Sequence, residues 1–404
     1  MQTIHDHSLI AQVEKWIAPL DLYEFYHLLI NNGFDEQGYY LNHPHLQPLA
    51  NTPLAFFLHF ANEGILNRLY FQPKNVNRDF LTILNELYQT FIENKFYKLA
   101  LVANFACSFM NERLFHDRAV TGATAREAAD LFSNADIQTL LMCKAFGALP
   151  YFVMGDSHSR LYQHHGLLSD NGWLLPIAMT CRGGSARGLA NTHSRFKYGN
   201  RLQLFFQRIQ PVIEQGIKCF FKFGQVDIEY LFNFKWSQEG YQKFDEEKFV
   251  TYTDTSIQRY IEFLSQLVPP HLRQHTFVCS VSLPVLADSI CKKIYLEGIF
   301  AFNPESQREI EKLCPTFYQM EVPNLQGRSQ LHLNFNQRLQ HKAAELGFPF
   351  ANDAILFIDE KTQVVKEIYT TQSAGLDVHL DRTEPTLLLI NQFINELLTG
   401  KTYA

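Results

Sequence analysis

The chain has 404 residues, of which 46% are hydrophobic and 14% are aromatic, and its formal net charge is -6 at pH 7. This length and composition predict a folded protein with room for more than one domain, and they argue against a disordered chain. The charges form no long basic run of the kind that a phosphate backbone attracts, so we expect no nucleic-acid partner.

Residues 1–16 lack both the basic stretch and the apolar stretch of a secretory signal. No stretch of the chain approaches the roughly 18 uninterrupted apolar residues that suggest a membrane-spanning helix. The seven cysteines are scattered singly, which is typical of reduced thiols. We therefore expect a cytoplasmic protein without an integral membrane segment, and export by a route that uses no such signal stays open.

The distribution of apolar residues changes near residue 148. Before it, apolar residues recur at helical spacing, as in residues 80–110, and strand-like alternation is absent. After it, short apolar runs alternate with helical stretches, a pattern typical of βαβ units and a parallel sheet. We predict a helical N-terminal domain over residues 1–148 and an α/β domain over residues 149–404.

The α/β domain is predicted to be a three-layer α/β/α sandwich of the flavodoxin-like type. In such a sheet, ligands bind outside the carboxyl ends of the strands, so the loops that follow the strands are the candidate site. The predicted strands span residues 151–155, 173–180, 218–224, 276–282 and 354–359, and the predicted helices span residues 200–215, 253–267, 333–346 and 384–398.

Two of these loops carry residue types that suit nucleophilic catalysis. Residues 155–159 read Gly-Asp-Ser-His-Ser, which puts the Ser157 hydroxyl after a glycine turn, although a serine there can instead cap the next helix. Residues 377–381 read Asp-Val-His-Leu-Asp, so that His379 stands between two carboxylates. A serine hydroxyl is a weak nucleophile at neutral pH and needs such a base.

Two further loops offer hydrogen-bond donors. Residues 181–191, CRGGSARGLAN, are rich in glycine and can present backbone N–H groups, and Ser185 within them is a rival nucleophile. The G-x-S-x-G pattern of a nucleophile elbow fails there, because Arg187 takes the place of the second glycine. Residues 224–227 read Gly-Gln-Val-Asp, and Asp227 is either a site residue or a helix cap.

In order and spacing, the four loops resemble the sequence blocks of the SGNH (GDSL-type) hydrolase and acyltransferase superfamily over residues 151–398. The resemblance implies that Ser157 is the nucleophile and that His379 is the general base. It also implies an oxyanion hole formed by the backbone N–H groups of Ser157 and of a glycine in the second loop, Gly184 or as second choice Gly188.

The chain departs from the family pattern at two places. The family has Asp-x-x-His, whereas here Asp377 precedes His379 by two residues and Asp381 follows it by two. We take Asp377 as the orienting carboxylate, with Asp381 as the open alternative. The family also has a donor asparagine where this chain has Val226, and the candidate replacements are Gln225, Arg187 and Asn191.

The form Gly-Asp-Ser-His, with the leucine after His379, resembles sugar O-acetyltransferases of that superfamily. Residues 33–68 resemble a segment of bacterial polysaccharide-related proteins. Together these resemblances imply a serine-dependent ester hydrolase or O-acyltransferase that acts on O-acyl groups of a carbohydrate or surface glycan. The additional residues that we expect to contact substrate are Asp156, His158, Arg187, Gln225 and Asp227.

Two other function classes stay open: a lipid or small-ester esterase, and a non-catalytic glycan-binding protein built on the same fold. A long apolar groove beside Ser157 would favour the esterase. The sequence contains no metal-binding or nucleotide-binding motif, so we expect neither a metal nor another cofactor.

Overall fold

The computed structural model describes residues 148–163, 167–168, 172–194, 196–302, 307–370 and 377–400. Nearly all of the predicted helical domain, including the segment at residues 33–68, lies outside these ranges. The domain boundary at residue 148 therefore stays a prediction. Among the described residues, no helix combines the length and the apolar character that a membrane crossing requires.

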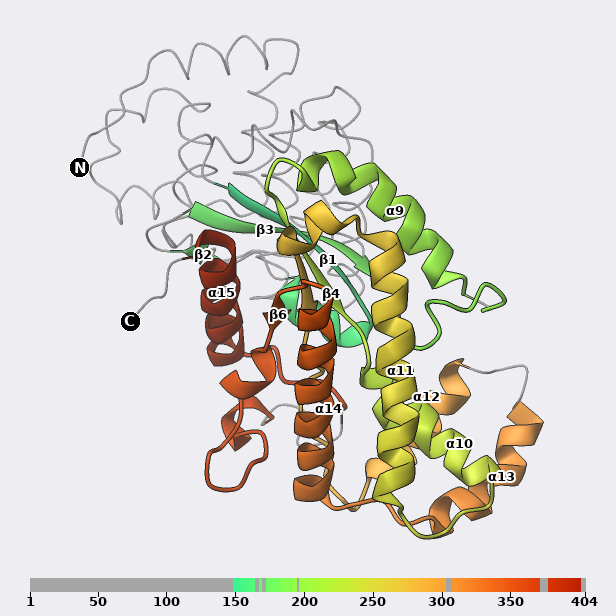
Figure 1. The fold of residues 1–404 in the computed structure, drawn as a ribbon. Coiled ribbons are helices and arrows are strands. Elements are labelled where there is room, and N and C mark those ends of the chain that lie inside the picture. The colour runs from blue at the N-terminus through green and yellow to red at the C-terminus, as the bar shows by residue number, and fades with distance from the viewer. Residues whose placement is uncertain are drawn as a thin grey trace, which may run out of the picture. The chain divides into compact units, whose positions relative to one another are not determined.

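The described residues form an α/β fold in which helices flank a mainly parallel sheet (Figure 1). The strand order is β2-β3-β1-β4-β5-β6, with parallel pairing from β1 through β4 and β5 to β6 and antiparallel pairing of β2 with β3. The predicted fold class is thus confirmed. The strands are β1 (Ala148–Gly155), β2 (Leu167–Leu168), β3 (Gly172–Thr180), β4 (Lys218–Lys222), β5 (Thr276–Cys279) and β6 (Phe350–Ala351).

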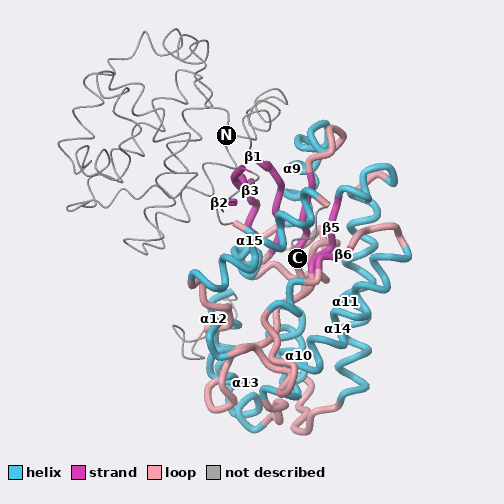
Figure 2. The backbone as a smooth tube through the Cα atoms, turned by 90° about the vertical axis from the view of Figure 1, so that its left-hand side faces the viewer, coloured by secondary structure: helices cyan, strands magenta, loops and turns pink. Residues whose placement is uncertain are grey.

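The helices cover both faces of the sheet. Figure 2 shows α11 and α14 together on one side of the strands and α15 on the other. Four predicted helices correspond to α9, α11, α14 and α15. The α-helices are α9 (Tyr198–Ile213), α10 (Phe232–Gln238), α11 (Glu246–Leu267), α12 (Cys291–Phe302), α13 (Gln307–Gln319), α14 (Leu325–Glu345) and α15 (Glu384–Thr399), and the short helices near the site are η4 (Ser157–Tyr162) and η5 (Asp227–Leu231).

The fifth predicted strand, at residues 354–359, is wrong. The strand is β6, and a short helix, η8 (Asp353–Leu356), follows it. The Asp353 carboxylate accepts hydrogen bonds from Lys222 Nζ at 2.8 and 2.9 Å and from Ser280 Oγ at 2.7 Å, and these bonds hold the chain in a turn. Ile355 is 55% exposed, so the apolar run that predicted a strand is not fully buried.

The central strand β1 leads directly into the candidate site. Residues 151–154 of β1 are fully buried, which fixes the position of the strand end. A Cβ atom at Gly155 would lie 2.5 Å from both the Lys222 carbonyl oxygen and Ser159 Cβ. Only glycine fits this approach of the chain to β4 and η4. The turn at Gly155 therefore sets where Ser157 emerges from the sheet.

Candidate active site

Ser157 begins η4, immediately after the turn at the end of β1. The cap of this helix is Asp156, whose Oδ1 accepts the His158 N–H at 2.9 Å. The capping role that the sequence left open for Ser157 is thus filled by its neighbour. Ser159 Oγ donates to the Asp156 carbonyl oxygen at 2.7 Å, which also tightens the turn. The half-buried Ser157 side chain is left to contact another segment.

That segment is the stretch before α15. His379 Nε2 lies 2.9 Å from Ser157 Oγ, and His379 Nδ1 lies 2.7 Å from Asp377 Oδ1. A carboxylate only accepts hydrogen bonds, so Nδ1 carries the proton and Nε2 is left to accept the Ser157 hydroxyl proton. Asp381 takes a different place: it is buried, and its backbone N–H donates to the Tyr369 carbonyl oxygen at 2.9 Å.

The electrostatic surroundings keep this arrangement ready to accept a proton. Burial alone would raise the pKa of Asp377, but its hydrogen bond and charge interaction with His379 lower that pKa to about 2. Burial and the positive charge of His158 lower the pKa of His379 below its usual 6.5, and the Asp377 carboxylate offsets only part of this. His379 is therefore neutral at pH 7, the state that a general base requires.

The glycine-rich second loop is anchored by Asp227. Its Oδ2 accepts the Ala186 N–H at 2.6 Å and its Oδ1 accepts the Arg187 N–H at 3.1 Å. The carboxyl group is fully buried, and burial raises its pKa to about 7 although the two N–H groups oppose the shift. These bonds to the second loop answer the question that the sequence left open: the side chain does not cap η5.

The two glycines assigned to the oxyanion hole use their N–H groups inside this loop. The Gly184 N–H donates to the Cys181 carbonyl oxygen at 2.8 Å, and the Gly188 N–H donates to Ser185 Oγ at 2.9 Å. The rival nucleophile Ser185 is therefore occupied as an acceptor. The oxyanion role of the two glycines stays a prediction. Whichever glycine serves as donor, its N–H must first leave the acceptor to which it is bonded in the structure.

Of the three candidate replacements for the missing asparagine, Gln225 has the most suitable surroundings. Its side chain is 1% exposed, and its amide lies beside the Glu229 carboxyl group, whose pKa it lowers. Asn191 lies on an exposed turn, where its Oδ1 accepts the His193 N–H at 3.0 Å. The Arg187 guanidinium lies 5.0 Å from the centre of the Tyr252 ring.

A buried carboxyl group that the sequence did not identify lies behind the site. Glu229 in η5 is 2% exposed, and burial raises its pKa to about 7, while the positive charge of His158 and the amide of Gln225 lower it. In the sequence, Glu229 stands between Ile228 and Tyr230, and these neighbours are the one local signal that it is buried. A buried acidic side chain usually has a partner. In the described ranges, no three His, Cys, Asp or Glu side chains gather in a way that could hold a metal ion.

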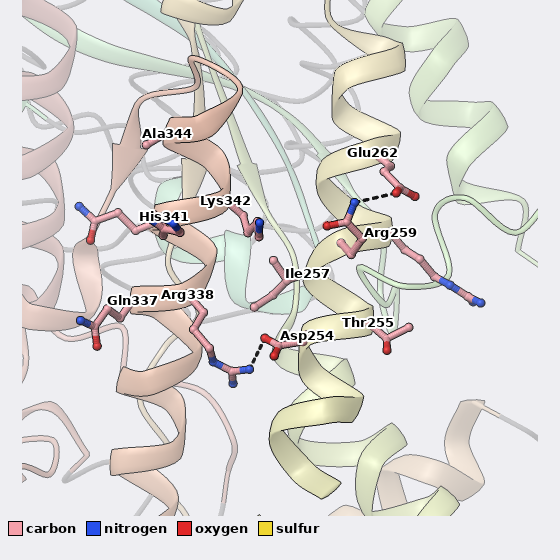
Figure 3. Close-up of a pocket in the computed structure, with 12 residues that line it drawn as sticks. Asp254, Thr255, Ile257, Arg259, Glu262, Gln337, Arg338, His341, Lys342 and Ala344 are labelled. Carbon is pink, nitrogen blue, oxygen red and sulfur yellow. Dashed lines mark hydrogen bonds and ion pairs between the residues drawn. The ribbon is translucent and has the colours of Figure 1, made fainter. Parts of the chain in front are cut away.

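A separate groove of about 1140 Å³ runs between α11 and α14 (Figure 3). Its walls carry mainly charged and polar side chains, and an ion pair between Arg338 and Asp254 crosses it. None of its lining residues belongs to the loops that follow the strands. The groove is thus not the apolar channel beside Ser157 that would favour a lipid esterase.

No family model matches the chain, and no curated protein matches it. Among solved structures, a crystal structure of a Bacteroides fragilis protein described as a "putative acylhydrolase" is similar over 62% of this chain and 87% of that chain. The two share 10% sequence identity, and the TM-score is 0.32. At that TM-score the likeness carries no conclusion about activity.

The contacts of the two aspartates predict different effects on His379. We expect nuclear magnetic resonance titration to give His379 a pKa below 6.5. Asp377→Asn should lower that pKa further, because the carboxylate that favours the charged ring is lost. Asp381→Asn is the matched control and should change the pKa less. A larger shift in the Asp381 variant would show that the other carboxylate orients the ring.

Proposed function

We propose that the protein is a serine-dependent ester hydrolase or O-acyltransferase that acts on O-acyl groups of a carbohydrate or surface glycan. One observation carries the proposal: the unbroken hydrogen-bonded chain from Ser157 Oγ through His379 to Asp377, with distances of 2.9 and 2.7 Å. A hydroxyl, an imidazole and a carboxylate in this order activate a serine for attack on a carbonyl carbon.

The first half of the reaction transfers the acyl group to the protein. Ser157 Oγ attacks the ester carbonyl carbon while its proton passes to His379 Nε2. Asp377 stabilises the imidazolium that forms by accepting its Nδ1–H. The tetrahedral intermediate then collapses, the bond to the alcohol oxygen breaks, and His379 returns the proton to that oxygen. The alcohol leaves, and the acyl group remains on Ser157.

The second half regenerates the serine. Water or a sugar hydroxyl gives its proton to His379 and attacks the acyl carbon. The bond to Ser157 Oγ breaks, and His379 returns the proton to that oxygen. Water as the attacking group yields a carboxylic acid, and a sugar hydroxyl yields a new ester. The same residues serve both outcomes, so the acceptor site decides between hydrolysis and transfer.

Both tetrahedral intermediates carry a negatively charged oxygen that needs donors. We assign one to the Ser157 N–H, which stands in the first turn of η4, where a helix offers its N–H groups no internal acceptor. The Gln225 side-chain amide, which is buried just after β4 and lies beside Glu229, is our choice for the second. Its NH₂ group can donate, which Val226 cannot do.

The carbohydrate substrate class is supported by an aromatic pair next to the glycine-rich loop. The rings of Phe196 and Tyr198 stack at 5.4 Å with an interplanar angle of 15°, and Phe196 is 39% exposed. The Tyr198 hydroxyl donates to the Arg182 carbonyl oxygen at 2.9 Å, which ties the pair to that loop. The exposed Phe196 ring offers an aromatic surface of the kind on which the apolar face of a sugar ring can pack.

The proposed activity is tested by comparing two serine variants on two substrates. We expect Ser157→Ala to abolish turnover of p-nitrophenyl acetate and of an O-acetylated oligosaccharide, while melting stays close to that of the parent protein. Ser185→Ala is the control and should retain turnover. Retained turnover in the Ser157 variant would refute the nucleophile, and a preference for long-chain acyl esters over the oligosaccharide would refute the substrate class.

The donor role of Gln225 predicts a loss of rate without a loss of substrate binding. Replacing it by Leu, which is similar in size but cannot donate, should lower kcat by about 10²- to 10³-fold, the range typical of one oxyanion donor. Asn191→Ala should leave kcat unchanged, because that side chain lies on an exposed turn. Kinetics and melting are measured on both variants. An unaltered kcat in a folded Gln225→Leu protein would exclude the role.

A further inference from the structure

A second imidazole stacks on the one that we propose as the base. His158 follows Ser157 in η4 and is 3% exposed. Its ring centre lies 4.4 Å from that of His379, and the two planes are inclined by 32°. The sequence left this histidine with only a general expectation of substrate contact. Its burial against His379 points to a different role.

Both ring nitrogens of His158 face oxygen atoms that only accept hydrogen bonds. Nε2 lies 3.2 Å from the carbonyl oxygen of Val378, the residue before His379, so Nε2 must carry a proton. Nδ1 lies 3.4 Å from Asp156 Oδ1, within ion-pair distance. Nδ1 has no hydrogen-bond partner, but a proton on it would face the Asp156 carboxylate at ion-pair distance, and a ring protonated at both nitrogens is an imidazolium.

The carboxyl groups around His158 favour the same charged state. Burial lowers the pKa of His158, but its interaction with the Asp156 carboxylate, the charge of Glu229 in η5 and the bond to Val378 outweigh burial and raise the pKa above 6.5. Asp156 and Glu229 are 1% and 2% exposed, so water screens their charges weakly. The surroundings of His158 therefore favour the charged form of its ring.

The groups that face His158 from α14 do not reverse this balance. Burial lowers the pKa of His332 to about 3, so that ring is neutral, and its Nδ1 lies 2.8 Å from the Ser282 carbonyl oxygen. The charge of Arg328, also in α14, acts on Glu229 and His332, and its Nη2 donates to Asp288 Oδ1 at 2.7 Å.

We propose that His158 is a positioning residue: an imidazolium that joins the Ser157 loop to the segment carrying His379 and fixes the distance between these two side chains. This role rests on the proposed function. The bond to the Val378 carbonyl holds the backbone next to His379, and the same ring packs against the His379 imidazole. A positive charge at 4.4 Å also opposes a second one on His379, which keeps the base neutral.

The charge of His158 can be measured without any turnover. In the ¹⁵N-labelled full chain at pH 7, we expect nuclear magnetic resonance to show His158 protonated at both nitrogens, assigned by the signal that His158→Gln removes. His332 is the matched buried control and should appear neutral. A neutral His158 ring at pH 7 would overturn the proposal even if Ser157 proves catalytic, and an imidazolium would support it even if the ester substrate is wrong.

The positioning role is tested with two variants of different character. His158→Gln keeps a donor for the Val378 carbonyl but removes the charge, so the acid limb of the pH profile of kcat/KM should move to higher pH. His158→Leu removes the donor as well, and at pH 8 its kcat should fall about tenfold or more below that of the Gln variant, with KM nearly unchanged. His271→Gln, at an exposed histidine, is the control.

Two results would contradict the positioning role. One is an acid limb that stays in place in the folded Gln variant, because the charge of His158 would then have no effect on His379. The other is equal kcat for the Gln and Leu variants, because the bond to Val378 would then position nothing. Melting curves of all three variants separate these results from a loss of fold.

Discussion

The hydrogen bond from Ser157 to His379 joins two loops that are 222 positions apart in the chain. Its length depends on where the buried strand β1 ends, on the turn that only Gly155 can make, and on the packing of α15 against η4. A shift of any of these elements by an ångström would break the bond. The sheet therefore acts mainly as a rigid support for this one contact.

The site gathers buried acids, and each has a distinct function in the fold. Asp227 is bonded to two N–H groups of the glycine-rich loop, and Asp156 both caps η4 and faces His158. An isolated buried carboxylate is costly, so partners of this kind are required. Asp156 Oδ2 and Glu229 Oε2 nevertheless remain buried without a hydrogen-bond partner. Unpaired polar atoms are typical of places that bind a ligand or water.

The sequence was sufficient for the α/β class, because the apolar runs of β1, β3, β4 and β5 are long enough to read. The sequence did not predict the position of β6, because this strand has only two residues. The turn after it depends on a hydrogen bond from Lys222, which is distant in the chain, to Asp353. The choice between Asp377 and Asp381 also needed the structure, since both flank His379 at the same spacing. Burial of Glu229 and the stacking of His158 on His379 are tertiary contacts that no local pattern encodes.

If the hydroxyl of Ser157 is the nucleophile, covalent labelling of the full chain will modify that residue. A fluorophosphonate probe forms a bond from the attacking oxygen to phosphorus and releases fluoride, and mass spectrometry of the peptides locates the adduct. We expect a single adduct on Ser157 that fails to form in the His379→Ala variant. An adduct on Ser185, or equal labelling of Ser157 without His379, would contradict this expectation.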